Sequence, residues 1–160
     1  MKAHSEQSPE YVVTRDEDDA TVAKALAILS QRLKTGRVFN RPDDIKAFLQ
    51  IELAQSEHEC FAVLFLDAQH QLIEFKNMFR GTLTQTSVYP REIVKEALRL
   101  NAGAVVFSHN HPSGSVTPSK ADETLTRTLK SALALVDVRV LDHIIVSMTG
   151  SMSMAEKGLL

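Results

Sequence analysis

Residues 104–122, AVVFSHNHPSGSVTPSKAD, join an apolar run to a polar turn and then to the start of an amphipathic segment. The run Ala104 to Phe107 is typical of a short buried strand, and the end of that strand delivers His109 and His111. Because alternate residues of a strand point to one face, the two imidazoles can converge on one ion. Asp122 on the next element offers a third ligand, which leaves a fourth position for water, as in catalytic zinc sites.

A second interpretation of Ser119 and Asp122 is a capping box, because a serine followed three residues later by an acid is typical of a helix start. A helix is predicted after the turn at residues 112–114, and its apolar face carries Leu125, Leu129, Leu133 and Val136. The two interpretations are compatible. A carboxylate held in the first turn of a helix can also face a metal.

A zinc hydrolase also needs a general base, because a carboxylate must take a proton from the attacking water and return it to the leaving group. Three upstream glutamates are candidates: Glu52, Glu57 and Glu59. Residue chemistry alone does not choose among them, and each can instead be a solvated surface side chain. Glu59 has one advantage, since it lies at the mouth of a predicted buried strand.

Two apolar stripes precede the candidate site. Residues 1–18 are polar and aperiodic, which predicts a flexible tail. From Asp19 the spacing predicts a helix that stops near Gly36, and Pro42 suits the first turn of a second helix. The stripes consist of Val22, Leu26, Leu29 and Leu33, and of Ile45, Phe48, Leu49 and Leu53. Residues 19–55 are therefore expected to form a two-helix N-terminal extension.

Strands and helices are predicted to interleave through the rest of the chain. Phe61 to Leu66 is continuously apolar, as in a strand covered on both faces, and a hairpin through Asp67 to Gln71 would join it to a second strand. The further expected elements are a strand over Leu72–Phe79, a helix from Pro90, a strand over Arg139–Val146 and an edge strand over Ser151–Met154. This pattern predicts an α/β fold, a three-layer sandwich with a mixed β-sheet flanked by helices.

Composition limits the class of protein. The chain has 160 residues, of which 44% are hydrophobic and 24% charged, so one globular domain with a real core is expected. A net charge of −2 and the acidic run at residues 15–19 make nucleic acid an unexpected partner. No stretch is apolar enough for a membrane span, and the first ten residues lack a signal-peptide core. We expect a cytoplasmic protein.

Cysteine and histidine usage narrows the chemistry further. The single cysteine, Cys60, excludes an internal disulfide and a four-cysteine zinc site, and it is expected to be a small core residue. It also excludes the P-C-x-x-C motif of zinc-dependent base deaminases. His143 lies in a predicted strand beside Asp142, and we interpret it as a structural, hydrogen-bonding histidine rather than a ligand.

Taken together, Glu59, His109, His111, Ser119 and Asp122 resemble the JAMM signature of MPN-domain metalloproteases, E…H-x-H-x7-S-x2-D. More closely, the chain resembles the bacterial RadC family over about residues 48–160. The pieces that carry this resemblance are ECFAVLFLD, GTLTQTSVYPREIVKEAL, SHNHPSGSVTPSKAD, VRVLDHIIV and AEKGLL. The RadC-like MPN domain is accordingly expected over residues 38–160, without the N-terminal helix-hairpin-helix region of longer members.

The resemblance implies a cytidine-deaminase-like sandwich that holds one Zn²⁺ on His109, His111 and Asp122. It implies that Glu59 is the general base and that the Ser119 hydroxyl helps to hold the oxyanion or the attacking water. The expected function is hydrolysis of a peptide or isopeptide bond in an unidentified peptide or protein substrate. Two alternatives stay open, a DNA-repair or mobile-element accessory protein and a non-catalytic MPN scaffold.

Overall fold

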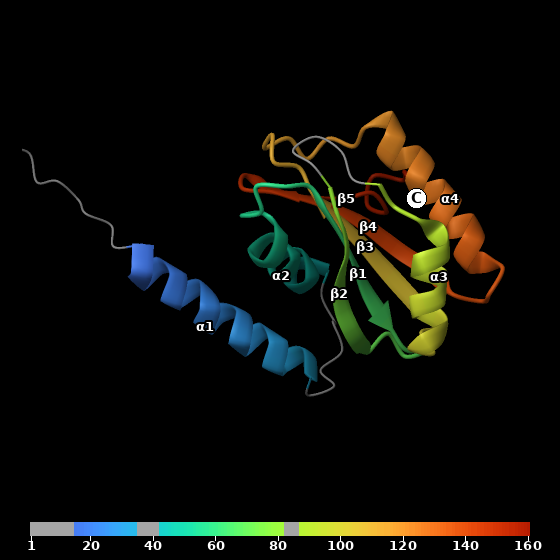
Figure 1. Cartoon of the computed structure of the whole chain (residues 1–160), viewed down its shortest axis with the longest axis horizontal. Coiled ribbons are helices and arrows are strands. Elements are labelled where there is room, and N and C mark those ends of the chain that lie inside the picture. The colour runs from blue at the N-terminus through green and yellow to red at the C-terminus, as the bar shows by residue number, and fades with distance from the viewer. Residues whose placement is uncertain (1–14, 35–41, 82–86) are drawn as a thin grey trace, which may run out of the picture.

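A five-stranded sheet with helices on both faces forms the body of the protein (Figure 1). The structure is a computed structural model that describes residues 15–34, 42–81 and 87–160. Its elements are α1 Arg15–Lys34, α2 Pro42–Leu53, β1 Cys60–Leu66, β2 Leu72–Arg80, α3 Pro90–Arg99, β3 Ala104–Asn110, α4 Lys120–Ala134, β4 Arg139–Ser147 and β5 Gly150–Ser153. The predicted α/β three-layer sandwich is confirmed.

The sheet is mixed, and its strand order is β2-β1-β3-β4-β5. β3 and β4 are parallel, whereas the β1–β2, β1–β3 and β4–β5 pairs are antiparallel. The predicted hairpin between β1 and β2 is present, and the Asp67 N–H donates to the Gln71 carbonyl at 2.9 Å across its turn. β1 and β3 lie at the centre, and every residue of both strands is buried. The ends of these two strands therefore meet in the interior of the sheet.

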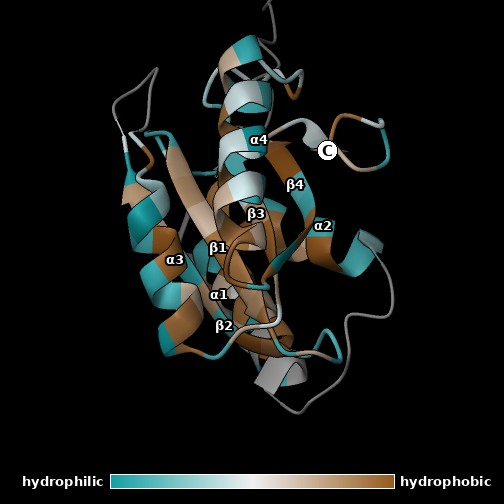
Figure 2. Ribbon diagram, turned by 90° about the vertical axis from the view of Figure 1, so that its right-hand side faces the viewer, coloured by the Kyte–Doolittle hydropathy of each residue, from teal (hydrophilic) through white to brown (hydrophobic). Residues whose placement is uncertain are grey.

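Each face of the sheet has its own apolar core. Side chains such as Ala62 and Leu64 face α2 and pack with Phe48, whereas Phe61 and Phe65 pack in the cluster under α3 and α4. In Figure 2 the hydrophobic colour is concentrated on the strands, while the flanking helices also carry hydrophilic residues. The alternation of β1 between two apolar cores explains why its sequence is apolar without a break.

α1 begins earlier than the sequence predicts. Residues 15–18 were expected to belong to the tail, but the helix starts at Arg15. Glu17 and Asp18 thus lie in its first turn, where negative charge interacts favourably with the helix dipole. The predicted tail over residues 1–14 and the predicted stop at Gly36 lie outside the described residues, and the division into tail, extension and domain stays a prediction. Within the described residues, no helix is long and apolar enough to cross a membrane.

Two further boundaries differ from the predictions. β3 continues beyond Phe107 to Asn110, because its polar residues at the end are buried and paired with β4 as far as Val146. α4 ends at Ala134, and Val136 reaches the core from the turn that follows. The extension of β3 matters most, since it makes the first candidate ligand, His109, part of the sheet.

Candidate metal centre

Three predicted ligands converge at the end of β3. His109 is the penultimate residue of the strand, His111 follows it, and Asp122 lies in the first turn of α4. The two Nε2 atoms are 2.9 Å apart, and His109 Nε2 is 3.4 Å from Asp122 Oδ1. One ligand atom from each residue falls within 4.8 Å of the others. The elements that carry them therefore bring together three residues that could hold a metal ion.

The separations fit a small tetrahedral ion. Zinc–nitrogen bonds of 2.0–2.1 Å place two ligands of a tetrahedron about 3.3 Å apart. The observed nitrogen–nitrogen and nitrogen–oxygen separations of 2.9 and 3.4 Å bracket that value. Two imidazoles and one carboxylate are also a donor set that zinc accepts, with a position left over for a further ligand. The residues present fit a Zn²⁺ ion of the catalytic type.

The two carboxylate oxygens of Asp122 make different contacts. Oδ2 accepts hydrogen bonds from the backbone N–H and the hydroxyl of Ser119, both at 2.7 Å, while the Asp122 N–H donates to Ser119 Oγ at 3.1 Å. This is the predicted capping box at the start of α4. Oδ1 is the oxygen that approaches His109. The cap thus fixes a carboxylate whose Oδ1 faces His109 and whose Oδ2 also lies 3.6 Å from His111 Nε2.

His111 is held by the turn that follows it. Its Nδ1 lies 2.8 Å from the carbonyl oxygen of Ser115. A carbonyl can only accept, so Nδ1 carries the proton, and in the neutral ring Nε2 keeps its lone pair. His111 therefore presents the nitrogen that a metal needs. The sequence did not reveal this contact, because a backbone carbonyl leaves no residue-specific signal.

His109 is almost fully buried and contacts a second buried histidine. Its Nδ1 lies 2.8 Å from Nε2 of His143, whose Nδ1 lies 2.6 Å from the Thr126 hydroxyl. Burial lowers the pKa of His109 to about 4, against the attraction of Asp122. A neutral imidazole is the form that binds a metal. His143 makes the hydrogen bonds that we predicted, whereas the part played by Thr126 was not foreseen.

Neighbouring groups at the site shift the pKa values of His111 and Asp122. The Asp122 carboxylate, whose Oδ2 lies 3.6 Å from His111 Nε2, raises the pKa of His111, burial opposes the rise, and the Ser115 carbonyl and the Glu59 carboxylate add to it. Burial alone would raise the pKa of Asp122, but the neighbouring imidazoles of His111 and His109 and the hydrogen bonds from Ser119 lower it well below its usual range. Asp122 is therefore a carboxylate, and its negative charge attracts a cation.

Glu59 lies immediately before β1, next to the ligands. Phe61 pairs with His109 in the antiparallel β1–β3 register, so the continued register sets Glu59 opposite His111. The attraction between Glu59 and His111 agrees with that position. Glu57 is exposed, and Glu52 lies on α2, where burial raises its carboxyl pKa. Of the three glutamates predicted as candidates, Glu59 has the position nearest to the imidazoles along the sheet.

Asn110 fastens the segment that carries Glu59. Its side chain is 1% exposed and points to the α2 side of β3. The Cys60 N–H donates to Oδ1 at 2.7 Å, and Nδ2 donates to the carbonyls of Ser56 and His58 at 3.2 and 3.0 Å. One residue between the two candidate ligands therefore ties residues 56–60 to the sheet. Cys60 is buried, as predicted for a core residue.

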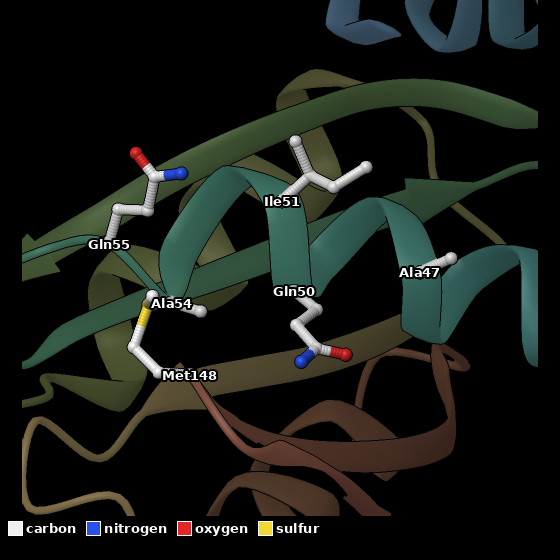
Figure 3. Close-up of a pocket in the computed structure, with 6 residues that line it drawn as sticks. All are labelled: Ala47, Gln50, Ile51, Ala54, Gln55 and Met148. Carbon is white, nitrogen blue, oxygen red and sulfur yellow. The ribbon is translucent and has the colours of Figure 1, made fainter. Parts of the chain in front are cut away.

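Two adjoining hollows lie on the α2 side of this edge. The first, of about 310 Å³, lies beside α2, and Figure 3 shows Met148 extending toward Ala54 at its wall. The second, of about 650 Å³, shares Ala54, Gln55 and Met148 with it and reaches Glu57 and Pro112. Pro112 directly follows His111 in the chain, so the second hollow reaches the residue next to a candidate ligand.

Known proteins identify the family. Residues 39–159 match the model of the RadC-like JAB domain. A UPF0758 protein of Polaromonas sp. is 60% identical over 88% of this chain and 63% of its own length, and a UPF0758 protein of Variovorax paradoxus is 58% identical over 89% and 66%. The chain thus spans less than two thirds of the length of these relatives. It belongs to the RadC family of proteins with a JAB domain.

Proposed function

We propose that the chain is a zinc-dependent hydrolase that cleaves a peptide or isopeptide bond. The observation that carries this proposal is the convergence of two imidazole nitrogens and one carboxylate oxygen beside Glu59. His109, His111 and Asp122 would hold one Zn²⁺ per chain. When bound there, zinc supplies a Lewis acid that polarises a carbonyl and lowers the pKa of water to about 7.

Glu59 is assigned the role of general base. It takes the proton of the attacking water and returns it to the departing nitrogen, which must leave as an amine. The backbone around Glu59 supports this role, since its carbonyl accepts from the Gly81 N–H at 2.8 Å and Asn110 holds the flanking residues. A base on an anchored segment keeps its carboxylate within reach of the reacting atoms.

Ser119 is proposed to act first through Asp122. Its hydroxyl donates to Asp122 Oδ2 at 2.7 Å, which keeps the carboxylate in the orientation that faces His109. The part expected from the resemblance, support of the oxyanion or the attacking water, stays a prediction. It would require the Ser119 hydroxyl to exchange its bond to Asp122 for one to the substrate.

The substrate is proposed to be a peptide segment that crosses the end of β1 and β3. The second hollow beside Pro112 and Met148 offers about 650 Å³ for a side chain flanking the scissile bond. Met148 is 68% exposed, and a flexible thioether adapts to apolar side chains of different shape. Glu57, at the same wall, favours a substrate without an acidic residue there.

The test combines metal analysis with cleavage of a peptide library. Wild-type protein is expected to hold one zinc per chain and to cleave a subset of peptides. Glu59→Gln should retain zinc and lose turnover by roughly 10²–10⁴-fold, the contribution of a general base. Glu74→Gln is the matched control, because Glu74 lies on β2 opposite Phe65 and contacts Arg99. Wild-type turnover in zinc-loaded Glu59→Gln would refute the assigned mechanism.

A further inference from the structure

Three buried contacts form an unbroken hydrogen-bond relay behind His109. His109 Nδ1 lies 2.8 Å from His143 Nε2, and His143 Nδ1 lies 2.6 Å from Thr126 Oγ1. The Thr126 hydroxyl in turn donates to the backbone carbonyl of Asp122 at 2.6 Å. Thr126 and His143 are 1% and 0% exposed. The relay therefore connects one candidate ligand to the backbone of another within the protein interior.

The Asp122 carbonyl sets the direction of every proton in this relay. A carbonyl oxygen only accepts, so the single hydroxyl proton of Thr126 is committed to it. Thr126 Oγ1 must then accept from His143 Nδ1–H, which leaves a lone pair on His143 Nε2. That lone pair accepts from His109 Nδ1–H. His109 Nε2 is consequently unprotonated, and it is the nitrogen that faces His111 and Asp122.

Other positions for the protons of Thr126 and His143 are less favourable. Met154 Sδ is a further acceptor for the Thr126 hydroxyl, but at 3.7 Å, and a thioether accepts poorly. Protonation of His143 would give both its nitrogens a proton, but the rings of Phe61 and Phe107 pack against it at centroid distances of 5.5 and 5.8 Å. The His143 side chain is fully buried, and burial disfavours the charged form of an imidazole, so the ring is neutral. A neutral ring has one proton, as the relay requires.

A second backbone carbonyl fixes the other imidazole in the same way. The Ser115 carbonyl holds the proton of His111 on Nδ1. With the Nδ1 protons held in this way, the neutral rings present their two Nε2 atoms, 2.9 Å apart, as the nitrogens that can bind one cation. Two main-chain oxygens therefore prepare the site for a cation before any metal arrives.

We propose that Thr126 and His143 are positioning residues that hold the His109 ring in its metal-binding tautomer, with the Asp122 carbonyl as the fixed end of the relay. This inference rests on the metal centre of the proposed function, but it does not depend on the reaction or the substrate. Partners of this kind behind a ligating histidine commonly change metal affinity 10- to 100-fold.

A matched pair of substitutions at Thr126 tests the relay. Thr126→Val keeps the shape of the side chain but removes the hydroxyl, whereas Thr126→Ser keeps the hydroxyl. Zinc affinity of the full chain is measured by competition with a chromogenic chelator. The valine variant should bind zinc roughly 10- to 100-fold more weakly, and the serine variant within about threefold of wild type. Equal affinity of the valine variant and wild type would overturn the proposal.

Imidazole ¹⁵N spectra of the zinc-free chain at pH 8 read the tautomers directly. Wild type should show a protonated Nδ1 and an unprotonated Nε2 on both His109 and His143, and Thr126→Val should move the His109 proton to Nε2. A wild-type His109 protonated on Nε2 would overturn the relay without any variant. Failure of wild type to bind zinc, with the predicted tautomers present, would instead refute the proposed function alone.

Discussion

At the end of β3, buried polar side chains on the two faces of the sheet make different contacts. On the α3 and α4 side, His109 lies in a chain of hydrogen bonds that ends at Asp122. On the α2 side, the Asn110 side-chain amide forms hydrogen bonds with the backbone of residues 56–60, the segment that carries Glu59. The first face arranges the ligands, and the second arranges the candidate base. Adjacent residues of one strand thereby support the proposed metal site and the proposed general base separately.

This division predicts that substitutions on the two faces have separable effects. Damage on the His109 face should appear first as lost metal affinity. Damage on the Asn110 face should appear as lost stability and turnover in a protein that still binds zinc. The experiments below are ordered by the size of the effect that this comparison predicts.

The largest effect is expected from His109→Ala. Removal of a ligand should cost more than removal of a partner behind one, so zinc affinity should fall by more than roughly 100-fold. Equilibrium competition with a chelator measures this, and circular dichroism checks that the fold is retained. His70→Ala is the control, because His70 contacts Arg139 instead of the metal centre. Stoichiometric, wild-type zinc binding by His109→Ala would exclude His109 as a ligand.

Asn110→Ala probes the opposite face. It deletes three hydrogen bonds and leaves the buried Cys60 N–H without its acceptor, so the free energy of unfolding should fall by about 1–3 kcal/mol. Urea denaturation measures the loss, and Asn77→Ala on the exposed side of β2 is the control. Zinc affinity should stay within a few-fold of wild type. A loss of zinc as large as in His109→Ala would show that the two faces are not separable.

The sequence could predict those contacts of the site that join residues close together in the chain. Ser119 and Asp122 are three residues apart, and His109 and His111 are two apart, so helix and strand periodicity brings each pair together without knowledge of the fold. The capping box was predictable for the same reason. The sheet likewise followed from apolar runs such as that of β1.

The contacts that complete the site are long-range or involve the main chain. Asn110 reaches residues more than fifty positions upstream, and Thr126 meets His143 only because α4 packs on β4. The sequence does not mark Thr126 as part of the site, because threonine is an ordinary residue in an amphipathic helix. The end of β3 was also missed, because the polar letters after Phe107 resemble a turn until their burial is known.

Ser119→Ala should have an intermediate effect. Loss of the helix cap should lower the free energy of unfolding by about 1 kcal/mol. The Asp122 carboxylate also loses a hydrogen bond that orients it, so zinc affinity should fall about tenfold. Ser131→Ala, on the exposed face of α4, is the matched control for thermal unfolding and zinc titration. Unchanged affinity would mean that the cap does not orient Asp122.

The smallest effect is expected in a region remote from both faces. Hydrogen bonds from Arg99 and then Lys76 lower the pKa of Glu96 to about 2. A lowered carboxyl pKa stabilises the fold fully above pH 4.5 and loses that contribution as the pH falls toward 2. Glu96→Gln should therefore cost less than about 1 kcal/mol at pH 7 and nothing near pH 2. Urea denaturation at several pH values checks this, and a constant difference would contradict it.

Zinc K-edge X-ray absorption of the zinc-loaded chain tests the central claim most directly. We predict a first shell of nitrogen and oxygen at about 2.0–2.1 Å, with outer-shell scattering from two imidazoles, in wild type. His109→Ala should lose one imidazole or all bound zinc. A zinc–sulfur distance near 2.3 Å would implicate Cys60, and a third imidazole would make His143 a ligand rather than a positioning residue. Either result would contradict the site described above.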